Sequence, residues 1–243
     1  MEGLLQKTRI LNKSIQHQSE QPADFDEMAR TLSELTEAAV YILDDQGQKL
    51  GYYKWPGVPR PELDGRICDQ RGIKPEYMEW LSNFNEVAVN YPLVEAFLTI
   101  IPIHSGQKRL GTLGLVKRKA FSTEDTILAE HGAAVIGLEI LRQISERNER
   151  ENRKREAVAQ ALAVLSYSEI EAVKYIFKEL EGDEGFVVAI RLADKYMLTR
   201  SVIVNALRKL ESAGVIQARS LGMKGTYIKV LNEYLYEQLA KME

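Results

Sequence analysis

The first third of the chain alternates between helical and extended hydrophobic patterns. Apolar residues recur at helical spacing in two stretches, and Asp24 stands where the second helix would take its N-cap. Two β-prone segments joined by the turn Asp44–Gly47 then predict a hairpin over 39–43 and 49–53. Residues 54–92 hold five of the seven prolines, so we expect irregular structure there, apart from a short helix near 76–84.

A second hairpin and a long helix follow. Residues 97–103 and 110–116 predict the hairpin, and Ser122 is an N-cap signal for a helix whose apolar periodicity continues to Leu141. Ten of the fifteen residues over 142–156 are charged, with opposite signs about one turn apart. The pattern is typical of a solvated helix, and without Gly or Pro it would be a stiff connection between two domains.

The C-terminal third begins with a further helix signal. Ser168–Glu171 is predicted to form a capping box that opens a helix ending near Leu180. Residues 186–231 then predict a helix, a tight turn, a second helix and a hairpin. Thr199 would cap the second helix, and Gly214 would end it.

The two faces of that second helix differ in chemistry. Its apolar residues span roughly 100° of arc, the width of a core-facing stripe; they are Ile203, Ala206, Leu207 and Leu210. The opposite face carries Ser201, Val204, Asn205 and Arg208, with Arg200 and Lys209 at its edges. This order of elements is the plan of a winged helix-turn-helix, which places the second helix in the DNA major groove and the hairpin near the backbone.

Charge is concentrated on the same segment. The 243 residues include 32 basic and 35 acidic ones, so the net charge of −3 indicates no polyanionic partner by itself. Residues 191–229, however, carry a net charge of +6, whereas 165–243 contain eleven residues of each sign. Neutralisation of phosphates requires such a local excess. The alternative is a small helical domain whose basic residues only keep it soluble.

The side-chain types on the outward face can read DNA bases. Arginine pairs with guanine and asparagine with adenine in the major groove. We therefore predict groove contacts from Thr199, Arg200, Ser201, Asn205 and Arg208, with Lys209 at the helix edge. The predicted phosphate contacts are Arg219, Lys224 and Lys229.

Several segments resemble one known family. Residues 189–216 (AIRLADKYMLTRSVIVNALRKLESAGVI) and 219–229 (RSLGMKGTYIK) closely resemble the DNA-binding domain of the CodY family of bacterial transcriptional regulators, most of which are repressors. LSYSE at 165–169, ILAEHG at 127–132 and LLQKTR at 4–9 are similar to the same family. The resemblance is weak over 52–92, and Met197 stands where the family usually has a glycine in the helix-turn-helix turn. If that position needs a positive φ, a methionine there costs on the order of 1 kcal/mol.

The resemblance implies an α+β architecture of three parts. These are a GAF-like effector-sensing domain over 1–142, a linker helix over 143–164 and a winged helix-turn-helix domain over 165–243. It also implies a homodimer or higher assembly on AT-rich inverted repeats of double-stranded DNA. The expected effectors are the branched-chain amino acids isoleucine, leucine and valine, with GTP as a second effector type, and no resident cofactor.

Effector-site residues are expected from the same resemblance. An amino-acid pocket needs a cation for the carboxylate and an apolar wall for the side chain. In the family an arginine followed by apolar residues supplies the cation, and a Phe-Pro-Val-like segment closes the wall. The corresponding candidates are Arg66, Ile67, Tyr91, Pro92 and Leu93, with Ile73 and Tyr77 between them. Arg60 competes with Arg66 for this role. The segment before the second hairpin is also several residues shorter than is usual in the family, which leaves open a changed ligand or none.

The sequence contains few signals for phosphate binding, metal binding or catalysis. Gly106–Thr112 has the glycine spacing of a phosphate loop, but the Lys-Ser/Thr pair is missing and a strand follows, so a hairpin turn is expected. His17, His104 and His131 are scattered, which predicts no metal site. Cys68, the single cysteine, excludes an internal disulfide and suits a reducing compartment. We find no catalytic constellation and expect no enzyme.

Two other functions remain open at this point. One is a nucleotide or small-molecule hydrolase built on the first domain. The other is a GAF-based interaction protein whose winged helix docks a partner protein. No run of about 18 apolar residues occurs, so we expect a cytoplasmic protein without a membrane span.

Overall fold

The computed structural model describes residues 2–16, 24–58, 71–180 and 182–242. They form two compact units, Met1–Ser145 and Glu146–Glu243. Both units combine helices with an antiparallel sheet, so the α+β architecture is confirmed.

The first unit is built on a five-stranded antiparallel sheet. Its strand order is β2-β1-β5-β4-β3. The strands are β1 (Ala39–Asp44), β2 (Lys49–Tyr53), β3 (Ala88–Pro92), β4 (Phe97–Ser105) and β5 (Lys108–Lys117). The β1–β2 and β4–β5 pairs confirm the two predicted hairpins. The segment with the glycine spacing of a phosphate loop begins in the tight turn between β4 and β5, so the expected hairpin turn is confirmed. Gly106 has a positive φ of 59° in this turn.

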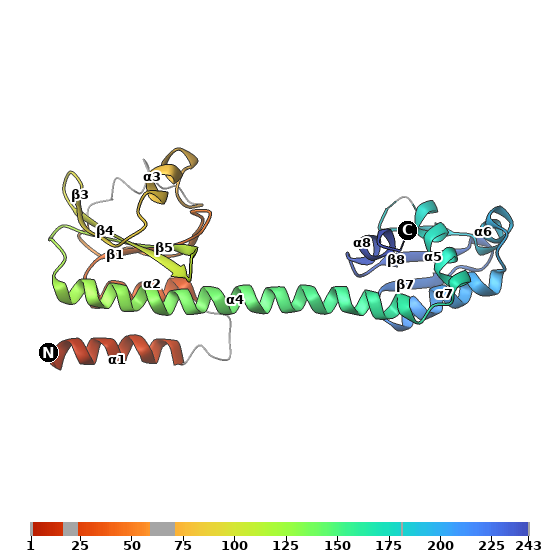
Figure 1. Ribbon diagram of the computed structural model, residues 1–243, viewed down its shortest axis with the longest axis horizontal. Coiled ribbons are helices and arrows are strands. Elements are labelled where there is room, and N and C mark those ends of the chain that lie inside the picture. Colours follow the sequence, from red (N-terminus) through yellow and green to blue (C-terminus); the bar gives the residue numbers. More distant parts are fainter. Residues whose placement is uncertain (1, 17–23, 59–70, 181, 243) are drawn as a thin grey trace. The chain divides into compact units, whose positions relative to one another are not determined.

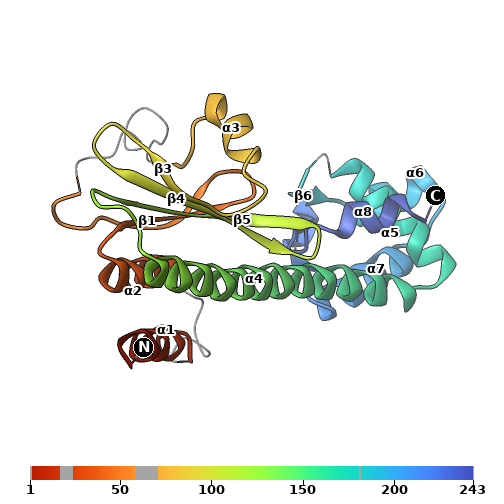
Figure 2. The same cartoon turned by 60° about the vertical axis from the view of Figure 1, so that its left-hand side comes forward.

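Helices cover one face of this sheet. Figures 1 and 2 show α2 (Phe25–Thr36) and the first half of α4 (Thr123–Ala163) side by side below the strands. The approach is close, because a Cβ added to Gly132 of α4 would lie 2.6 Å from Leu32 Cδ2 of α2. Asp24 caps α2 as predicted, since its side chain accepts from two main-chain N–H groups of the first turn. The N-terminal helix α1 (Glu2–Gln16) also belongs to this unit.

The opposite face carries a second apolar layer. Tyr41 and Leu43 of β1 point into it, whereas their neighbours Val40 and Ile42 point to the helices. A 3-10 turn, η2 (Pro75–Tyr77), leads into the short helix α3 (Met78–Ser82) above this layer. The expectation of a short helix near 76–84 is therefore confirmed.

The prediction of otherwise irregular structure over 54–92 was wrong at its end. β3 pairs with β4 as an edge strand, with a shift of register between Ala88 and Tyr91. Asn90 lies at this irregularity with a φ of 57°. Pro92 argued against a strand in the sequence. Proline is nevertheless tolerated in an edge strand, because the N–H group that it lacks is not needed for pairing with a neighbouring strand.

Helix α4 runs for 41 residues without a break and supplies residues to both units. Ser122 precedes it and exchanges hydrogen bonds with Asp125, as the N-cap signal predicted. The charged stretch of α4 is solvated and carries the expected pairs one turn apart, Arg147–Glu151 at 3.2 Å and Arg153–Glu149 at 3.3 Å.

In the described residues, the second unit packs the end of α4, four shorter helices and a three-stranded sheet around one core. The helices are α5 (Tyr167–Glu179), α6 (Ala189–Tyr196), α7 (Arg200–Ser212) and α8 (Leu235–Ala240). The sheet has the order β6-β8-β7, from β6 (Glu184–Val187), β7 (Ile216–Ser220) and β8 (Thr226–Val230). A 3-10 turn, η3 (Gly222–Lys224), joins β7 to β8, so the predicted hairpin is confirmed.

Two local predictions in this unit were wrong. The capping box of α5 uses Ser166 and Glu169, two residues before the predicted pair Ser168 and Glu171. Residues 184–187 form the strand β6 beside β8, and the first helix of the helix-turn-helix begins only at Ala189. The wing therefore has three strands where two were expected.

Candidate nucleic-acid interface and ligand pocket

The turn between α6 and α7 fixes the direction of the second helix. Met197 adopts the left-handed conformation with a φ of 56°, and its side chain is 92% exposed. Thr199 caps α7, since its hydroxyl accepts from the N–H of Val202 at 3.4 Å. The predicted stripe of Ile203, Ala206, Leu207 and Leu210 is buried in the core. Because one face of α7 is fixed in this way, the opposite face is held toward solvent.

The side chains on that outward face are exposed. Thr199, Arg200, Ser201, Asn205 and Arg208 all lie at the surface. Within the described residues, the side chains of the last four have no hydrogen bond or ion pair. Their donors and cationic groups are therefore free to meet a polyanion.

The remaining predicted DNA contacts divide into two kinds. Arg219 of β7 and Lys224 at the wing tip are exposed and have no ion-pair partner in the described part of the chain. Lys229 pairs with Glu184 at 3.3 Å, although about half of its side chain is exposed. Lys209 pairs with Glu169 at 2.7 Å and also donates to the carbonyl oxygen of Val164. The structure thus brings Lys209 to α5, away from the other candidates.

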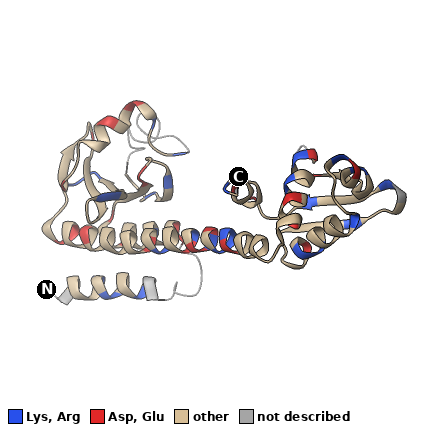
Figure 3. Cartoon of the chain, turned by 45° about the vertical axis from the view of Figure 1, so that its right-hand side comes forward, with Lys and Arg blue, Asp and Glu red and all other residues tan. Residues whose placement is uncertain are grey.

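The wing has a conformational requirement at its tip. Gly225 has a φ of 98°, and a Cβ there would lie 2.6 Å from the carbonyl oxygen of Val187. Only glycine allows the strands to approach in this way. Figure 3 shows Lys and Arg on the helices and wing of this unit, among acidic residues, and both signs in alternation along the middle of α4.

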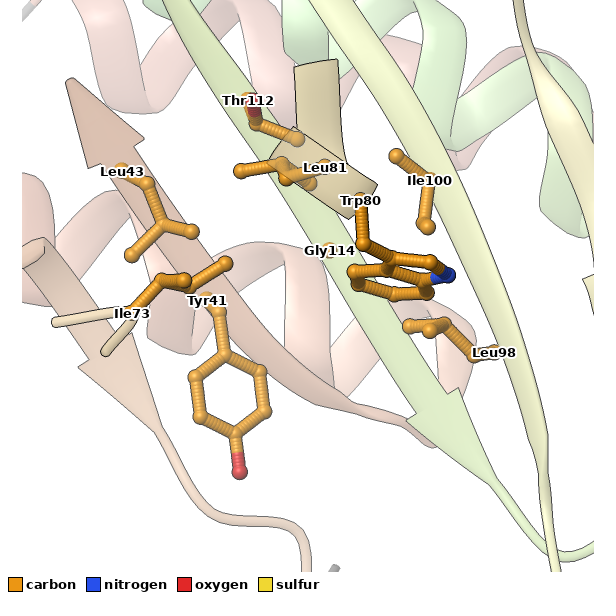
Figure 4. Close-up of a pocket in the computed structure, with 9 residues that line it drawn as sticks. All are labelled: Tyr41, Leu43, Ile73, Trp80, Leu81, Leu98, Ile100, Thr112 and Gly114. Carbon is orange, nitrogen blue, oxygen red and sulfur yellow. The ribbon is translucent and has the colours of Figure 1, made fainter. Parts of the chain in front are cut away.

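A small, partly open cavity lies in the apolar layer between the sheet and α3 in the first unit. Its volume is about 30 Å³. Side chains from β1, β4, β5, the segment before η2, and α3 line it, as Figure 4 shows: Tyr41, Leu43, Ile73, Trp80, Leu81, Leu98, Ile100, Thr112 and Gly114. The wall is apolar, so this space suits a hydrocarbon side chain better than a charged group.

Only some of the effector residues predicted from the sequence lie at this cavity. Ile73 lines it, and Leu93 packs against the same apolar cluster. Tyr91 lies one ring further out, with its centroid 6.0 Å from that of Trp80. Tyr77 and Pro92 are not among the lining residues. Arg60, Arg66, Ile67 and Cys68 lie outside the described residues, as does His17.

Sequence reasoning missed most of the lining. Three pairs at alternate positions face the cavity from neighbouring strands: Tyr41 and Leu43, Leu98 and Ile100, Thr112 and Gly114. Their period of two along predicted strands was a usable signal. Trp80 had no such signal, because its helix has only five residues.

A partly buried arginine lies at the edge of the cavity. Nη1 of Arg109 donates to the carbonyl oxygens of Leu81 and Phe84 at 3.3 and 3.1 Å, and Nη2 donates to the hydroxyl of Thr112 at 2.8 Å. Burial lowers the pKa of Arg109 below its usual value. These acceptors are all uncharged, so the residue ties the end of α3 to the sheet through neutral polar groups.

Among the residues the structure describes, no group of three His, Cys, Asp or Glu side chains is placed to hold a metal ion. In the same part of the chain, no helix is both long and apolar enough to cross a bilayer.

A helix-turn-helix with a free polar and basic second helix, followed by a wing, defines the second unit as a winged helix-turn-helix domain. The first unit is an α+β domain built on an antiparallel sheet. The family model described as the CodY GAF-like domain matches residues 3–164, and that of the CodY helix-turn-helix domain matches residues 183–243. The chain therefore belongs to the CodY family.

Relatives support this assignment over the whole length. The global transcriptional regulator CodY of Caldanaerobacter subterraneus subsp. tengcongensis is 49% identical over 99% of this chain and 98% of its own. The global transcriptional regulator CodY of Thermoanaerobacter sp. is 48% identical over 100% of this chain and 100% of its own. Among solved structures, the cofactor-binding GAF domain of the nutrient sensor CodY from Clostridium difficile is 27% identical, with a TM-score of 0.43 over 56% of this chain and 96% of that one. The family consists of transcriptional regulators, so the protein is a regulator and not an enzyme, as expected.

Proposed function

We propose that this regulator binds AT-rich inverted repeats of double-stranded DNA as a homodimer, and that a branched-chain amino acid in the first unit controls its operator affinity. The observation that carries the DNA-binding part is the outward face of α7, whose polar and cationic side chains lack partners within the described chain.

The proposed contacts follow from the position of each side chain. Arg208 and Asn205 would read base edges in the major groove, with Thr199, Arg200 and Ser201 at the start of the helix. Arg219, Lys224 and Lys229 would neutralise phosphates beside the groove. Lys209 is the weakest of the candidates, because Glu169 already holds its ammonium group.

An exposed apolar stripe on α4 supports the homodimer. Ile127 and Leu138 are 44% and 69% exposed, and a groove of about 430 Å³ runs between this helix and β4. A two-fold symmetric operator requires two half-site readers, and an isologous helix contact would supply them. We propose that a second copy of the chain covers this stripe.

The domain boundaries remain part of the proposal. We keep a sensing domain over 1–142, a linker helix over 143–164 and a DNA-binding domain over 165–243. Val158 and Leu162 pack in the core of the second unit. The last turns of the proposed linker are therefore rigidly joined to the DNA-binding part.

The apolar cavity supports an amino-acid effector with a hydrocarbon side chain. Isoleucine, leucine and valine fit this chemistry, and either Arg60 or Arg66 would hold the carboxylate. GTP does not fit the small apolar cavity, so its proposed role as a second effector rests on the resemblance alone. An effector shifts operator affinity only by its different affinities for two states of the protein.

A binding titration tests this function directly. We expect the full chain to bind a labelled AT-rich inverted repeat with a steep salt dependence, and to prefer it over a scrambled duplex. Isoleucine, leucine or valine should change that affinity. Arg208→Ala should cost about 1–3 kcal/mol at fixed salt, whereas Lys178→Ala on α5 removes the same charge and should have little effect.

The other two functions predict different outcomes. Equal binding to both duplexes would indicate that the winged domain docks a protein. GTP hydrolysis by a clean preparation would favour a hydrolase and contradict the proposal.

A further inference from the structure

Trp80 is the largest side chain that lines the apolar cavity. It stands on α3, and in Figure 4 its indole lies beside Leu98, Ile100 and Gly114. The strand residues around it are almost completely buried; Leu98 and Ile100 are each 2% exposed. Trp80 is only half-buried, so it can swing outward at a smaller cost than the residues of the sheet.

The cavity is too small for the side chain of the proposed effectors. A volume of about 30 Å³ corresponds to roughly two water molecules, whereas isoleucine and leucine each carry a four-carbon side chain. A ligand of that size must therefore displace part of the wall. Protein interiors are close-packed, so another side chain must leave the space that the ligand enters.

The surroundings of Trp80 form an outer aromatic layer. Its ring packs edge-on against Phe84, at 5.0 Å between centroids, and against Tyr91 at 6.0 Å. Phe84 and Tyr91 pack edge-on against each other at 5.8 Å. Tyr91 is 39% exposed, so the outer side of this aromatic layer reaches solvent.

Arg109 fixes the base of this layer. Its guanidinium donates to the carbonyl oxygens of Leu81 and Phe84, which stand on either side of the end of α3. The helix end is thereby tied to Thr112 on β5, which Nη2 also contacts. Because the main chain is held in this way, a rotation of the Trp80 side chain is the movement that opens the cavity with the least rearrangement.

We propose that the Trp80 indole occupies the place of the effector side chain, leaves it when the effector binds, and sets the largest side chain that the pocket accepts. The inference rests on the proposed amino-acid effector. It makes Trp80 a residue that determines the specificity of that pocket. The free and the effector-bound protein then differ in the position of the Trp80 indole ring.

Trp80 can report on its own movement. The chain has two tryptophans, so Trp55→Phe leaves Trp80 as the single tryptophan, whose emission is observed by excitation at a wavelength that tyrosine does not absorb. We expect isoleucine to produce a saturable red shift of its emission, with the midpoint that calorimetry gives for binding. Isoleucine binding without any change in this emission would overturn the proposal.

Two variants separate the residue from the pocket. Trp80→Ala should raise the isoleucine affinity about tenfold or more, because the binding-competent fraction rises, and it should admit phenylalanine. Gly114→Ala should weaken isoleucine binding by filling the cavity from the sheet, since its methyl group would touch only Tyr41 Cβ, at 3.7 Å. Trp55→Ala is the control for loss of an indole elsewhere and should preserve the size preference.

The outcomes distinguish the two levels of the proposal. If Gly114→Ala weakens binding but Trp80→Ala changes neither the affinity nor the size preference, the pocket is correct and the role of Trp80 is wrong. If neither the wild type nor Trp80→Ala binds isoleucine, leucine or valine, the proposed effector and the role of Trp80 both fail.

Discussion

Lys209 of α7 and Glu169 of α5 form an ion pair in which Nζ lies 2.7 Å from Oε2. The same carboxylate oxygen accepts the N–H of Ser166 at 2.7 Å in the capping box of α5. One carboxylate therefore serves both the start of α5 and the attachment of α7. The pair fixes the helix that carries the proposed DNA contacts.

Removal of Lys209 is expected to affect stability more than DNA binding. Lys209→Met leaves the Glu169 carboxylate, whose side chain is only 9% exposed, without its cation. We expect a loss of about 1–2 kcal/mol in the free energy of unfolding, above the usual value for an exposed pair. Urea denaturation and operator titration of the same preparation provide the measurements. A loss of operator affinity as large as that of Arg208→Ala, with unchanged stability, would contradict this role.

The contribution of this pair depends on pH in a defined direction. The hydrogen bond from Lys209, and then that from the Ser166 N–H, lower the pKa of Glu169 below its usual value of 4.5. Because the pKa is lower in the folded state, the stabilisation is present above the unfolded value and is lost as the pH falls through the folded one. The difference in melting temperature between wild type and Lys209→Met should therefore narrow below about pH 4.5. A constant difference down to about pH 3 would show that the pair does not carry the effect.

The sequence predicted features that depend on neighbours along the chain. The faces of α7 followed from the spacing of Ile203 and Leu210, because packing on a helix repeats every 3.6 residues. The capping box was misplaced because Ser166 and Ser168 each stand three residues before a glutamate. Leu165 and Ile170, at the N′ and N4 positions, pack in the core. This hydrophobic contact favours Ser166 over Ser168 as the N-cap of α5.

Features that depend on distant partners could not be predicted in the same way. β6 is a short edge strand that is defined by its pairing with β8, a strand far along the chain. The cavity combines three strands with α3, so no single segment indicates it. The ion pair of Lys209 joins residues 40 positions apart, which charge counting along α7 does not detect.

Met197 gives a prediction for the helix-turn-helix turn. Its φ of 56° lies in the left-handed region, as the usual glycine at this position suggested. Met197→Gly should stabilise the second unit by about 1 kcal/mol and raise its melting temperature by several degrees. Arg191→Gly is the matched control, because the same change inside α6 should destabilise by about 1 kcal/mol. A fall in melting temperature for Met197→Gly would show that the thioether chain contributes contacts that outweigh the backbone strain.

Asn90 gives a prediction for the edge of the sensor sheet. Its amide nitrogen donates to the carbonyl oxygen of Phe121 at 3.2 Å, and its amide oxygen accepts the Phe121 N–H at 2.6 Å. Two bonds thus hold β3 to the segment before α4, and asparagine also tolerates the positive φ. Asn90→Ala should cost about 2–3 kcal/mol, since both bonds are lost and the backbone is strained. Asn90→Asp keeps the acceptor and should cost about half as much. Calorimetry of the full chain would measure both, and a loss below about 1 kcal/mol for Asn90→Ala would show that other contacts hold this edge strand.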